Sequence, residues 1–192
     1  FGTNNYIEEL VNILMFIVES EKKYCVGVGE KKDILVFLPG VEEIKSLKYF
    51  IGNNPCFNDI KHVLSIDGEA VKEDHKDFYT LNLKQRSRAI ILSTVVAETG
   101  LTLDNLGYVI DPGWSREVEV YQPYGYWCLV TKPAALSRVN QRMGRVGRNS
   151  DGEYFSVYTR NTMDNLMKQQ HPEIIIKGID DILLQVIAVN GP

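Results

Sequence analysis

The eight residues QRMGRVGR, at positions 141–148, contain three arginines and two glycines. On a helix, Gln141, Arg145 and Arg148 follow one another at i, i+4 and i+7, so they would share one face. Arginine stays charged and presents a planar fork that matches phosphate oxygens, which suits it to stabilise charge on a transferring phosphoryl group. A solvated basic face, or cations at a helix C-terminus, is the structural alternative. The repeated Gly-Arg-x-Gly-Arg after Gln-Arg favours phosphate chemistry.

Composition restricts where a polyanion can bind. The chain has 192 residues and a net charge of -4, so a nucleic acid must bind a local basic patch rather than the surface as a whole. Hydrophobic residues make up 44% of the chain, which is enough for the core of one domain with at most a small appendage. The apolar run at 10–18 is too short to span a bilayer, so no membrane segment is expected.

Cysteines and histidines are few and scattered, with no pair at metal-ligand spacing: Cys25, Cys56, Cys128, His62, His75 and His171. A disulfide framework or a zinc site is therefore not expected, and no residue of this chain is predicted to bind a metal. An odd number of separated cysteines is typical of a reducing compartment, so we expect an intracellular protein, in the cytoplasm or nucleus.

Hydrophobic periodicity and turn residues divide the chain into alternating elements. Helices are predicted at about 4–20, 41–51, 69–83 and 133–144, and again after Pro172. Short apolar runs predict strands at 34–38, 61–66, 89–94, 107–113 and 152–159, and alternating residues predict a hairpin at 114–132. Strands that alternate with helices form parallel sheets covered on both faces, and ligands bind at the carboxyl ends of such strands.

Four segments resemble, in order and spacing, motifs of the superfamily 2 DExH/DEAH RNA helicases. The octet at 141–148 resembles motif VI, and ILVFLPGVEEI at 34–44 resembles motif IV. ILSTVVAETGLTLDNLGYVIDPG at 91–113 resembles motif V with its following strand. PEIIIKGIDDILLQVIAVNG at 172–191 resembles the first helices of the winged-helix module that follows in DEAH helicases. The resemblance extends from about Lys32 to the last residue.

This resemblance implies the second RecA-like lobe of such a helicase. The expected fold is α/β, with a mostly parallel sheet of the P-loop NTPase type, helices on both faces and a β-hairpin, over residues 1–160. Residues 161–192 would be a helical extension that begins the winged-helix module. Neither GxxxxGK[ST] nor DExH occurs, and Lys-Glu-Asp-His at 72–75 has its letters in the wrong order. ATP, or another NTP, and Mg²⁺ would therefore be held mainly by an N-terminal RecA-like lobe of the same protein, and this fragment alone would be inactive.

The resemblance also implies roles for motif VI. Arg145 and Arg148 would be arginine fingers that reach the γ-phosphate of an ATP bound on the other lobe. Gln141 would contact the same phosphate or position the attacking water. Arg142 would hold motif VI in place through ion pairs between the lobes.

Four further positions are implied at the nucleotide. Asp104 would bind the ribose hydroxyls, with Thr102 beside it, and a helix N-cap is the structural alternative for Asp104. Phe78 lies where the family has an aromatic residue that stacks on the base, and a core position is its alternative. Gly100 stands where the family has a hydroxyl that senses the nucleotide.

Three residues are implied at single-stranded RNA. Ser93 and Thr94 resemble a hydroxyl pair that binds a phosphate, and Arg116 lies where the family has a basic residue that faces RNA. The hairpin at 117–131 resembles the family's hairpin near the nucleic-acid path. Four aromatic residues there would stack on bases or pack against the protein: Tyr121, Tyr124, Tyr126 and Trp127.

Motif V departs from the DEAH pattern at Val95, where the family has Asn, and at Gly100, where it has Ser. Glu-x-Gly at 98–100 and Gly-Arg-Val-Gly-Arg at 144–148 are more similar to helicases of positive-strand RNA viruses. A viral origin, in a host cytoplasm, and a divergent cellular origin therefore both stay open. The implied function is the second motor lobe of an ATP-dependent RNA helicase that moves 3′ to 5′ and unwinds. The alternatives are a non-catalytic RNA-binding or interaction lobe, and a DNA translocase of the same superfamily.

Overall fold

The computed structural model describes most of the chain: residues 6–24, 31–67, 88–98, 103, 105–121, 126–148, 151–169, 183 and 186–189. A five-stranded sheet lies at its centre, in the order β2-β3-β1-β4-β7. Its strands are β1 (Asp33–Phe37), β2 (His62–Ile66), β3 (Ala89–Ser93), β4 (Leu106–Asp111) and β7 (Glu153–Ser156). Every neighbouring pair runs parallel, which confirms the predicted α/β class.

The apolar runs become the central strands because parallel strands are buried on both faces. β1 and β3 are buried along their whole length, and they pair in register from Ile34 with Ile90 to Phe37 with Ser93. All five strands point the same way, so the loops that follow β1, β3 and β4 meet at one edge. Motif V and the loop that follows β4 therefore lie side by side at the edge where ligands bind parallel sheets.

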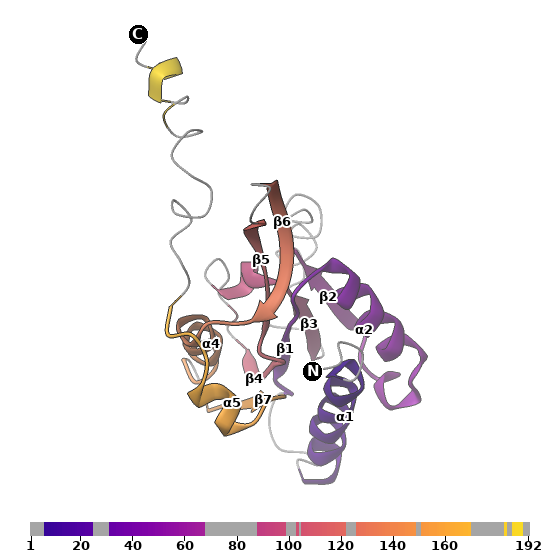
Figure 1. Cartoon of the computed structure of the whole chain (residues 1–192). Helices are drawn as coiled ribbons and strands as arrows, with labels where there is room; N and C mark the ends of the chain where they lie inside the picture. Colours follow the sequence, from indigo (N-terminus) through magenta and orange to yellow (C-terminus); the bar gives the residue numbers. More distant parts are fainter. Residues whose placement is uncertain are drawn as a thin grey trace.

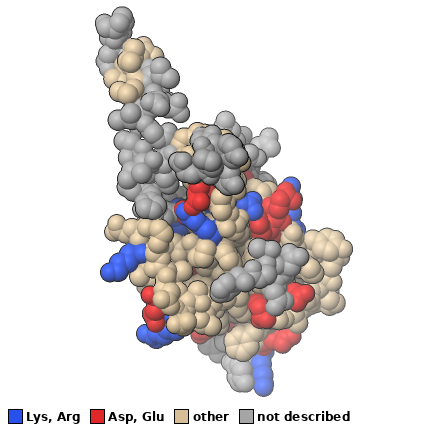
Figure 2. All heavy atoms as spheres, in the orientation of Figure 1, with Lys and Arg blue, Asp and Glu red and all other residues tan. Residues whose placement is uncertain are grey.

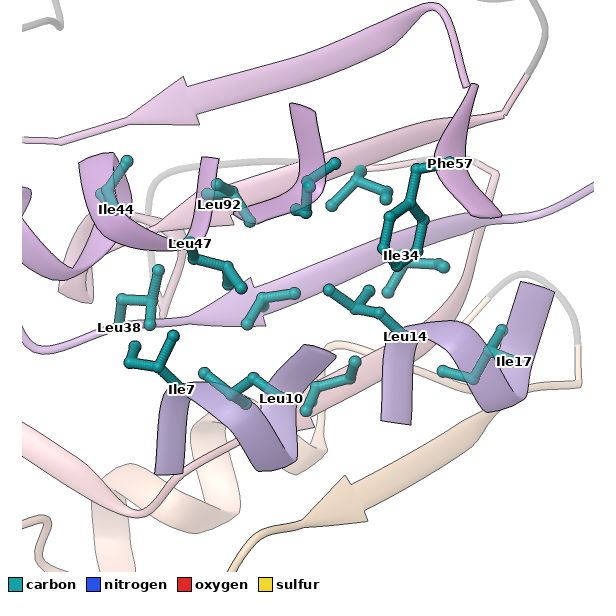
Figure 3. Close-up of a cluster of buried hydrophobic side chains, with 14 of the residues drawn as sticks. Ile7, Leu10, Leu14, Ile17, Ile34, Leu38, Ile44, Leu47, Phe57 and Leu92 are labelled. Atoms are coloured by element: carbon teal, nitrogen blue, oxygen red, sulfur yellow. The ribbon is translucent and has the colours of Figure 1, made fainter. Parts of the chain in front are cut away.

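One face of the sheet is covered by two helices, α1 (Tyr6–Tyr24) and α2 (Val41–Asn53), and by the short 3-10 helix η1 (Pro55–Phe57) (Figure 1). Figure 3 shows the side chains of Leu10, Leu14 and Leu47 pointing from these helices toward the strands, and none of the three is exposed. The contacts bury the apolar stripe that the helical spacing predicts.

The opposite face holds a smaller core around Phe37, Ile91 and Val109. It is covered by the 3-10 helix η3 (Val95–Glu98) and by the region that begins with α4 (Leu136–Met143), with Val96 and Val146 packed against it. Motifs V and VI thus lie together on this face, because each supplies apolar side chains to the same core.

A two-stranded antiparallel hairpin follows β4. Its strands β5 (Trp114–Tyr121) and β6 (Tyr126–Pro133) pair from Trp114 with Pro133 to Tyr121 with Tyr126, as the alternating pattern predicts. The chain turns into β5 at Gly113, which has a φ of +77° and whose added Cβ would lie 2.6 Å from the Tyr158 ring. Figure 1 shows the hairpin extending away from the sheet.

Two predicted helix boundaries need correction. α4 begins at Leu136 and not at residue 133, because Pro133 ends β6. α1 continues to Tyr24, past the predicted end at residue 20, because its last turn is tied down: Glu21 pairs with the buried Arg88, and Lys22 lies 3.0 Å from Asp59. A short helix, α5 (Arg160–Asp164), lies where the helical extension at 161–192 is predicted to begin, and its N-cap Thr159 accepts a hydrogen bond from the N–H of Thr162.

The predicted helix at 69–83 lies outside the described residues, as does most of the segment after Pro172. Residues 183 and 186–189 are helical, and the winged-helix module and the boundary at 160 stay predictions. Among the helices that the structure describes, none is both long and apolar enough to cross a membrane.

Candidate nucleotide and nucleic-acid site

Motif VI is a helix followed by a turn. α4 ends at Met143, where Gly144 is the C-cap, and Arg145 to Arg148 lie in the turn that follows. The prediction that Gln141, Arg145 and Arg148 share one helical face is therefore wrong. Gly147 keeps Arg148 off the helix, because its φ of +78° belongs to the left-handed region that a helix excludes.

The turn presents two guanidinium groups close together. Arg148 is exposed and its Nε donates to the carbonyl of Gly144 at 2.7 Å. Arg145 is half-buried, and one of its terminal nitrogens donates to the backbone carbonyl of Glu98 in η3. Burial lowers the pKa of Arg145, and the nearby charge of Arg148 lowers it further. Two guanidinium groups that repel each other form a site that a polyanion would stabilise. Gln141 is exposed on the last turn of α4.

Arg142 has a different environment, with a side chain only 1% exposed. Its Nε donates to Glu98 Oε1 at 2.7 Å, and one terminal nitrogen donates to Asp111 Oδ1 at 2.7 Å. The guanidinium also lies over the ring of Phe37, 5.1 Å from its centroid. Burial lowers the pKa of Arg142, but the two carboxylates outweigh burial and raise it overall. Both partners belong to this lobe, so the prediction that Arg142 forms ion pairs between the lobes is wrong.

Asp111, at the end of β4, is fully buried and satisfied by several donors. Its Oδ1 also accepts from the N–H of Gly113 at 2.8 Å, and its Oδ2 accepts from the hydroxyl of Tyr154 at 2.6 Å. The Tyr154 hydroxyl lies 2.8 Å from that of Tyr158. Burial and the charge of Asp111 raise the pKa of Tyr154, and they raise that of Tyr158 to about 12.

Glu98 is contacted by three arginines of the α4 region. Its two carboxylate oxygens face Arg142 and Arg138, the latter at 3.3 Å from Oε2, and its carbonyl accepts from Arg145. Burial raises the pKa of Glu98 even though Arg142 and Arg138 act to lower it. Motif V is thereby joined to motif VI through one side chain and one backbone carbonyl.

The carboxylates nearest the turn offer nothing to a magnesium ion. Glu98 is 5% exposed and Asp111 is fully buried, and the oxygens of both face arginines. Magnesium needs carboxylate oxygens that are open to it and to water. The donor set of these described residues fits phosphate and does not fit Mg²⁺.

The predicted RNA residues are placed differently from one another. Ser93 is fully buried, and its hydroxyl lies 3.1 Å from the carbonyls of Ile66 and Thr94. It has no exposed atom to offer a phosphate, so the structure gives Ser93 a structural role that joins β2 to β3. Thr94 is half-buried and is the accessible member of the pair.

Arg116 lies at the base of the hairpin, half-buried. Its guanidinium is 2.8 Å from Glu43 of α2, and its Nε donates to the hydroxyl of Thr131. An added Cβ at Gly40 would lie 2.2 Å from this guanidinium, so the glycine of motif IV lets the arginine lie against the backbone. Arg116 therefore joins the hairpin to α2 in this structure.

The remaining predicted residues fall into two groups. Phe78, Gly100, Thr102 and Asp104 lie outside the described residues, as does Tyr124. On the hairpin, Tyr126 is 53% exposed and Trp127 is 48% exposed. Both residues are therefore about half exposed on the hairpin. Figure 2 shows basic and acidic side chains interspersed on the face displayed, which agrees with local rather than global recognition of a polyanion.

Sequence reasoning missed Glu98, Asp111, Arg138 and Tyr154. Glu98 and Asp111 stand in segments that were recognised, in Ala-Glu-Thr-Gly and Asp-Pro-Gly, and a charged residue beside a buried strand is a signal that it has a partner. Arg138 and Tyr154 carry no such signal, because only the fold brings α4 and β7 to these carboxylates.

Comparison with known proteins agrees with this geometry. Residues 10–150 match the family described as the helicase conserved C-terminal domain, and the chain belongs to that family. This confirms the resemblance to the C-terminal RecA-like lobe of DExH/DEAH-type RNA helicases.

Named relatives cover nearly the whole chain. The B962L protein of African swine fever virus, named as a candidate RNA helicase, is 36% identical over 97% of this chain and 21% of its own length. The human ATP-dependent RNA helicase DHX29 is 30% identical over 82% of this chain and 12% of its own. The crystal structure of the Escherichia coli DEAH/RHA helicase HrpB superposes with a TM-score of 0.66 at 24% identity, over 91% of this chain and 22% of that one. The chain spans about a fifth or less of these proteins.

Proposed function

We propose that this chain is the second motor lobe of an ATP-dependent RNA helicase, in which Arg145 and Arg148 complete the ATP site as arginine fingers. Gln141 contacts the same γ-phosphate or positions the attacking water. ATP and Mg²⁺ are held mainly by an N-terminal RecA-like lobe of the same protein. The observation that supports this most is the pair of guanidinium groups on a turn braced by the buried Arg142.

The brace supports a catalytic role because a transition state gains from charges that are already in place. Arg142 fixes the end of α4 to Glu98 and Asp111, so the following turn holds Arg145 and Arg148 without a large reorganisation. Closure of the cleft between lobes would bring the turn to a phosphate bound on the other lobe, and hydrolysis would let the lobes part and step 3′ to 5′ along RNA.

The nucleotide and RNA contacts complete the proposal. Asp104 and Thr102 bind the ribose, Phe78 stacks on the base, and Gly100 lies beside the nucleotide. Thr94 contacts an RNA phosphate. Arg116 now pairs with Glu43 at 2.8 Å, and it contacts an RNA phosphate when it leaves Glu43. A winged-helix module begins after residue 160, and the protein acts inside the cell.

The experiment that tests this function is the ATPase of the full-length protein with single-stranded RNA, with single-stranded DNA of the same sequence, and with neither. Stimulation by RNA well above DNA supports an RNA helicase. Equal or greater stimulation of the ATPase by DNA would instead indicate a DNA translocase. A full-length protein that binds RNA and hydrolyses no ATP would make this a non-catalytic binding lobe.

A further inference from the structure

A chain of ion pairs runs from motif V to the hairpin through one residue of α4. Arg138 places one terminal nitrogen 3.3 Å from Glu98 Oε2, and its Nε lies 3.8 Å from Glu117 Oε1. The three side chains are 18%, 5% and 9% exposed respectively, so their charges are screened less than those of a surface pair. Arg138 therefore bridges two carboxylates that belong to separate parts of the lobe.

The far end of this bridge is fixed within the hairpin. Glu117 Oε1 accepts from the hydroxyl of the buried Ser115 at 2.7 Å, and Glu117 Oε2 lies 3.0 Å from the ammonium of Lys132 on β6. The same ammonium lies 2.5 Å from Glu119. Ser115, Glu117 and Glu119 alternate along β5 and so share one face of the hairpin. At the base of the hairpin, α4 contacts this face through Arg138 and Glu117.

The near end of the bridge is fixed to the phosphate-binding turn. Glu98, which Arg138 contacts, also accepts from the predicted finger Arg145 through its backbone carbonyl. A finger that leaves this carbonyl for a phosphate changes the contacts of Glu98. Arg138 is the element through which such a change reaches the hairpin, because it contacts Glu98 and Glu117 at once.

We propose that Arg138 is a positioning residue that couples the nucleotide state of the Arg145–Arg148 turn to the position of the β5–β6 hairpin, by bridging Glu98 and Glu117. The inference rests on the proposed helicase function, since it assigns to Arg138 the link between hydrolysis and duplex opening. Arg138 touches neither the nucleotide nor the RNA in this assignment. Its loss uncouples the two steps and does not abolish either directly.

The test uses the full-length protein and the ratio of base pairs opened to ATP hydrolysed. Arg138→Gln removes the charge of the bridge, and Glu117→Gln removes its hairpin end while leaving Glu98 paired with Arg142. Lys45→Gln is the matched control. It also removes one charge and one ion pair, the exposed pair with Glu42 on α2.

The expected result is a ratio about tenfold lower in Arg138→Gln and in Glu117→Gln, with RNA-stimulated ATPase within about threefold of wild type and Lys45→Gln unchanged. The double variant should be no worse than either single variant, because both break one bridge. An unchanged ratio in Glu117→Gln, or equal losses of ATPase and unwinding in Arg138→Gln, would overturn the coupling role while the helicase function stands. A wild-type protein without ATPase would instead overturn the proposed function itself.

Discussion

The Nε of Arg142 donates to Glu98 Oε1 at 2.7 Å, and this buried contact joins motif V to the start of motif VI. Neither residue contacts a phosphate in the proposed mechanism. Their role is to hold the turn that follows, because η3 and α4 move together when one buried ion pair connects them. The arrangement separates the arginine that supports the site from the two arginines that act in it.

Loss of the buried arginine should destabilise the lobe strongly. Arg142→Met leaves Glu98 and Asp111 buried with fewer donors, and removal of one partner from a buried ion pair costs about 3–5 kcal/mol. We expect a large fall in the temperature of unfolding of the purified protein, measured by circular dichroism. Lys45→Gln should leave that temperature unchanged, because its ion pair with Glu42 is exposed. A Tm of Arg142→Met equal to that of wild type would contradict the bracing role.

Gly147, which shapes the turn, should respond differently from a glycine in a helix. Gly147→Ala places a side chain at a φ of +78°, which costs about 1–2 kcal/mol, and it should reduce ATPase by displacing Arg148. Gly147→Asn should retain more activity, because Asn tolerates this conformation. Gly52→Ala is the control: nothing lies within 4 Å of its added Cβ, and Ala favours the helix. Equal activity in the Ala and Asn variants would show that backbone conformation at residue 147 does not matter.

Gly152 tests packing rather than backbone angle. An added Cβ there would lie 2.2 Å from Val146 Cγ2 and 2.6 Å from the carbonyl of Gly107. Gly152→Ala should therefore push Val146 off the core and shift the turn that carries Arg145 and Arg148. The expected outcome is a lower kcat for RNA-stimulated ATPase together with a lower Tm, measured in the full-length protein. Wild-type values of both would contradict this close approach.

The half-buried tyrosines Tyr154 and Tyr158 predict a loss of stability at high pH. The pKa of Tyr158 is about 12 in the folded chain against an ordinary value of 10.0, because burial and Asp111 disfavour the phenolate. A group with a raised folded pKa contributes stability that is complete below its unfolded pKa and is lost as the pH rises through the folded value. The free energy of unfolding should therefore decline between about pH 10 and 12. Phenolate absorbance measures the titration, and circular dichroism measures the unfolding. Tyr158→Phe should flatten the decline, and Tyr49→Phe, at a 70% exposed position, should not.

The hairpin arginine gives a test of RNA contact. Glu43→Gln removes the partner of Arg116, 2.8 Å away, and so frees the guanidinium for a phosphate. We expect tighter binding of single-stranded RNA by Glu43→Gln, while Arg116→Gln binds more weakly and loses about one unit of the slope of log Kd against log salt. Fluorescence anisotropy over a salt series measures both. RNA binding unchanged in the two variants would make Arg116 purely a link between hairpin and α2.

The sheet was predictable because a buried parallel strand needs apolar residues at every position, as in Ile34 to Phe37 and in Ala89 to Leu92. The hairpin followed from the alternation around Val118 and Val120, which was recognised without knowledge of the fold. The predicted end of α4 at residue 144 is one residue from the observed end at Met143. The shared helical face of Gln141, Arg145 and Arg148 was not predicted correctly, because Arg145 to Arg148 lie in a turn in which Gly147 has a conformation that a helix excludes.

The buried ion pairs were beyond prediction for a physical reason. Arg142 looked like one more cation in a basic octet, and only the fold shows that Asp111 ends β4 directly beside it. Ser93 similarly offered a hydroxyl at the correct edge of the sheet, but the register of β3 with β2 turns that hydroxyl toward the carbonyl of Ile66. Residue type and spacing predicted a candidate site at this edge of the sheet, and the partners of each side chain depended on tertiary contacts.

The most direct measurement is the RNA-stimulated ATPase of the full-length protein, wild type beside Arg148→Ala. Arg148 is exposed, so its removal should leave the fold and RNA binding intact, which circular dichroism and anisotropy verify. The arginine-finger assignment predicts a fall in kcat of about a thousandfold or more. A kcat within a few-fold of wild type would contradict it, and Arg148 would then have no direct part in hydrolysis.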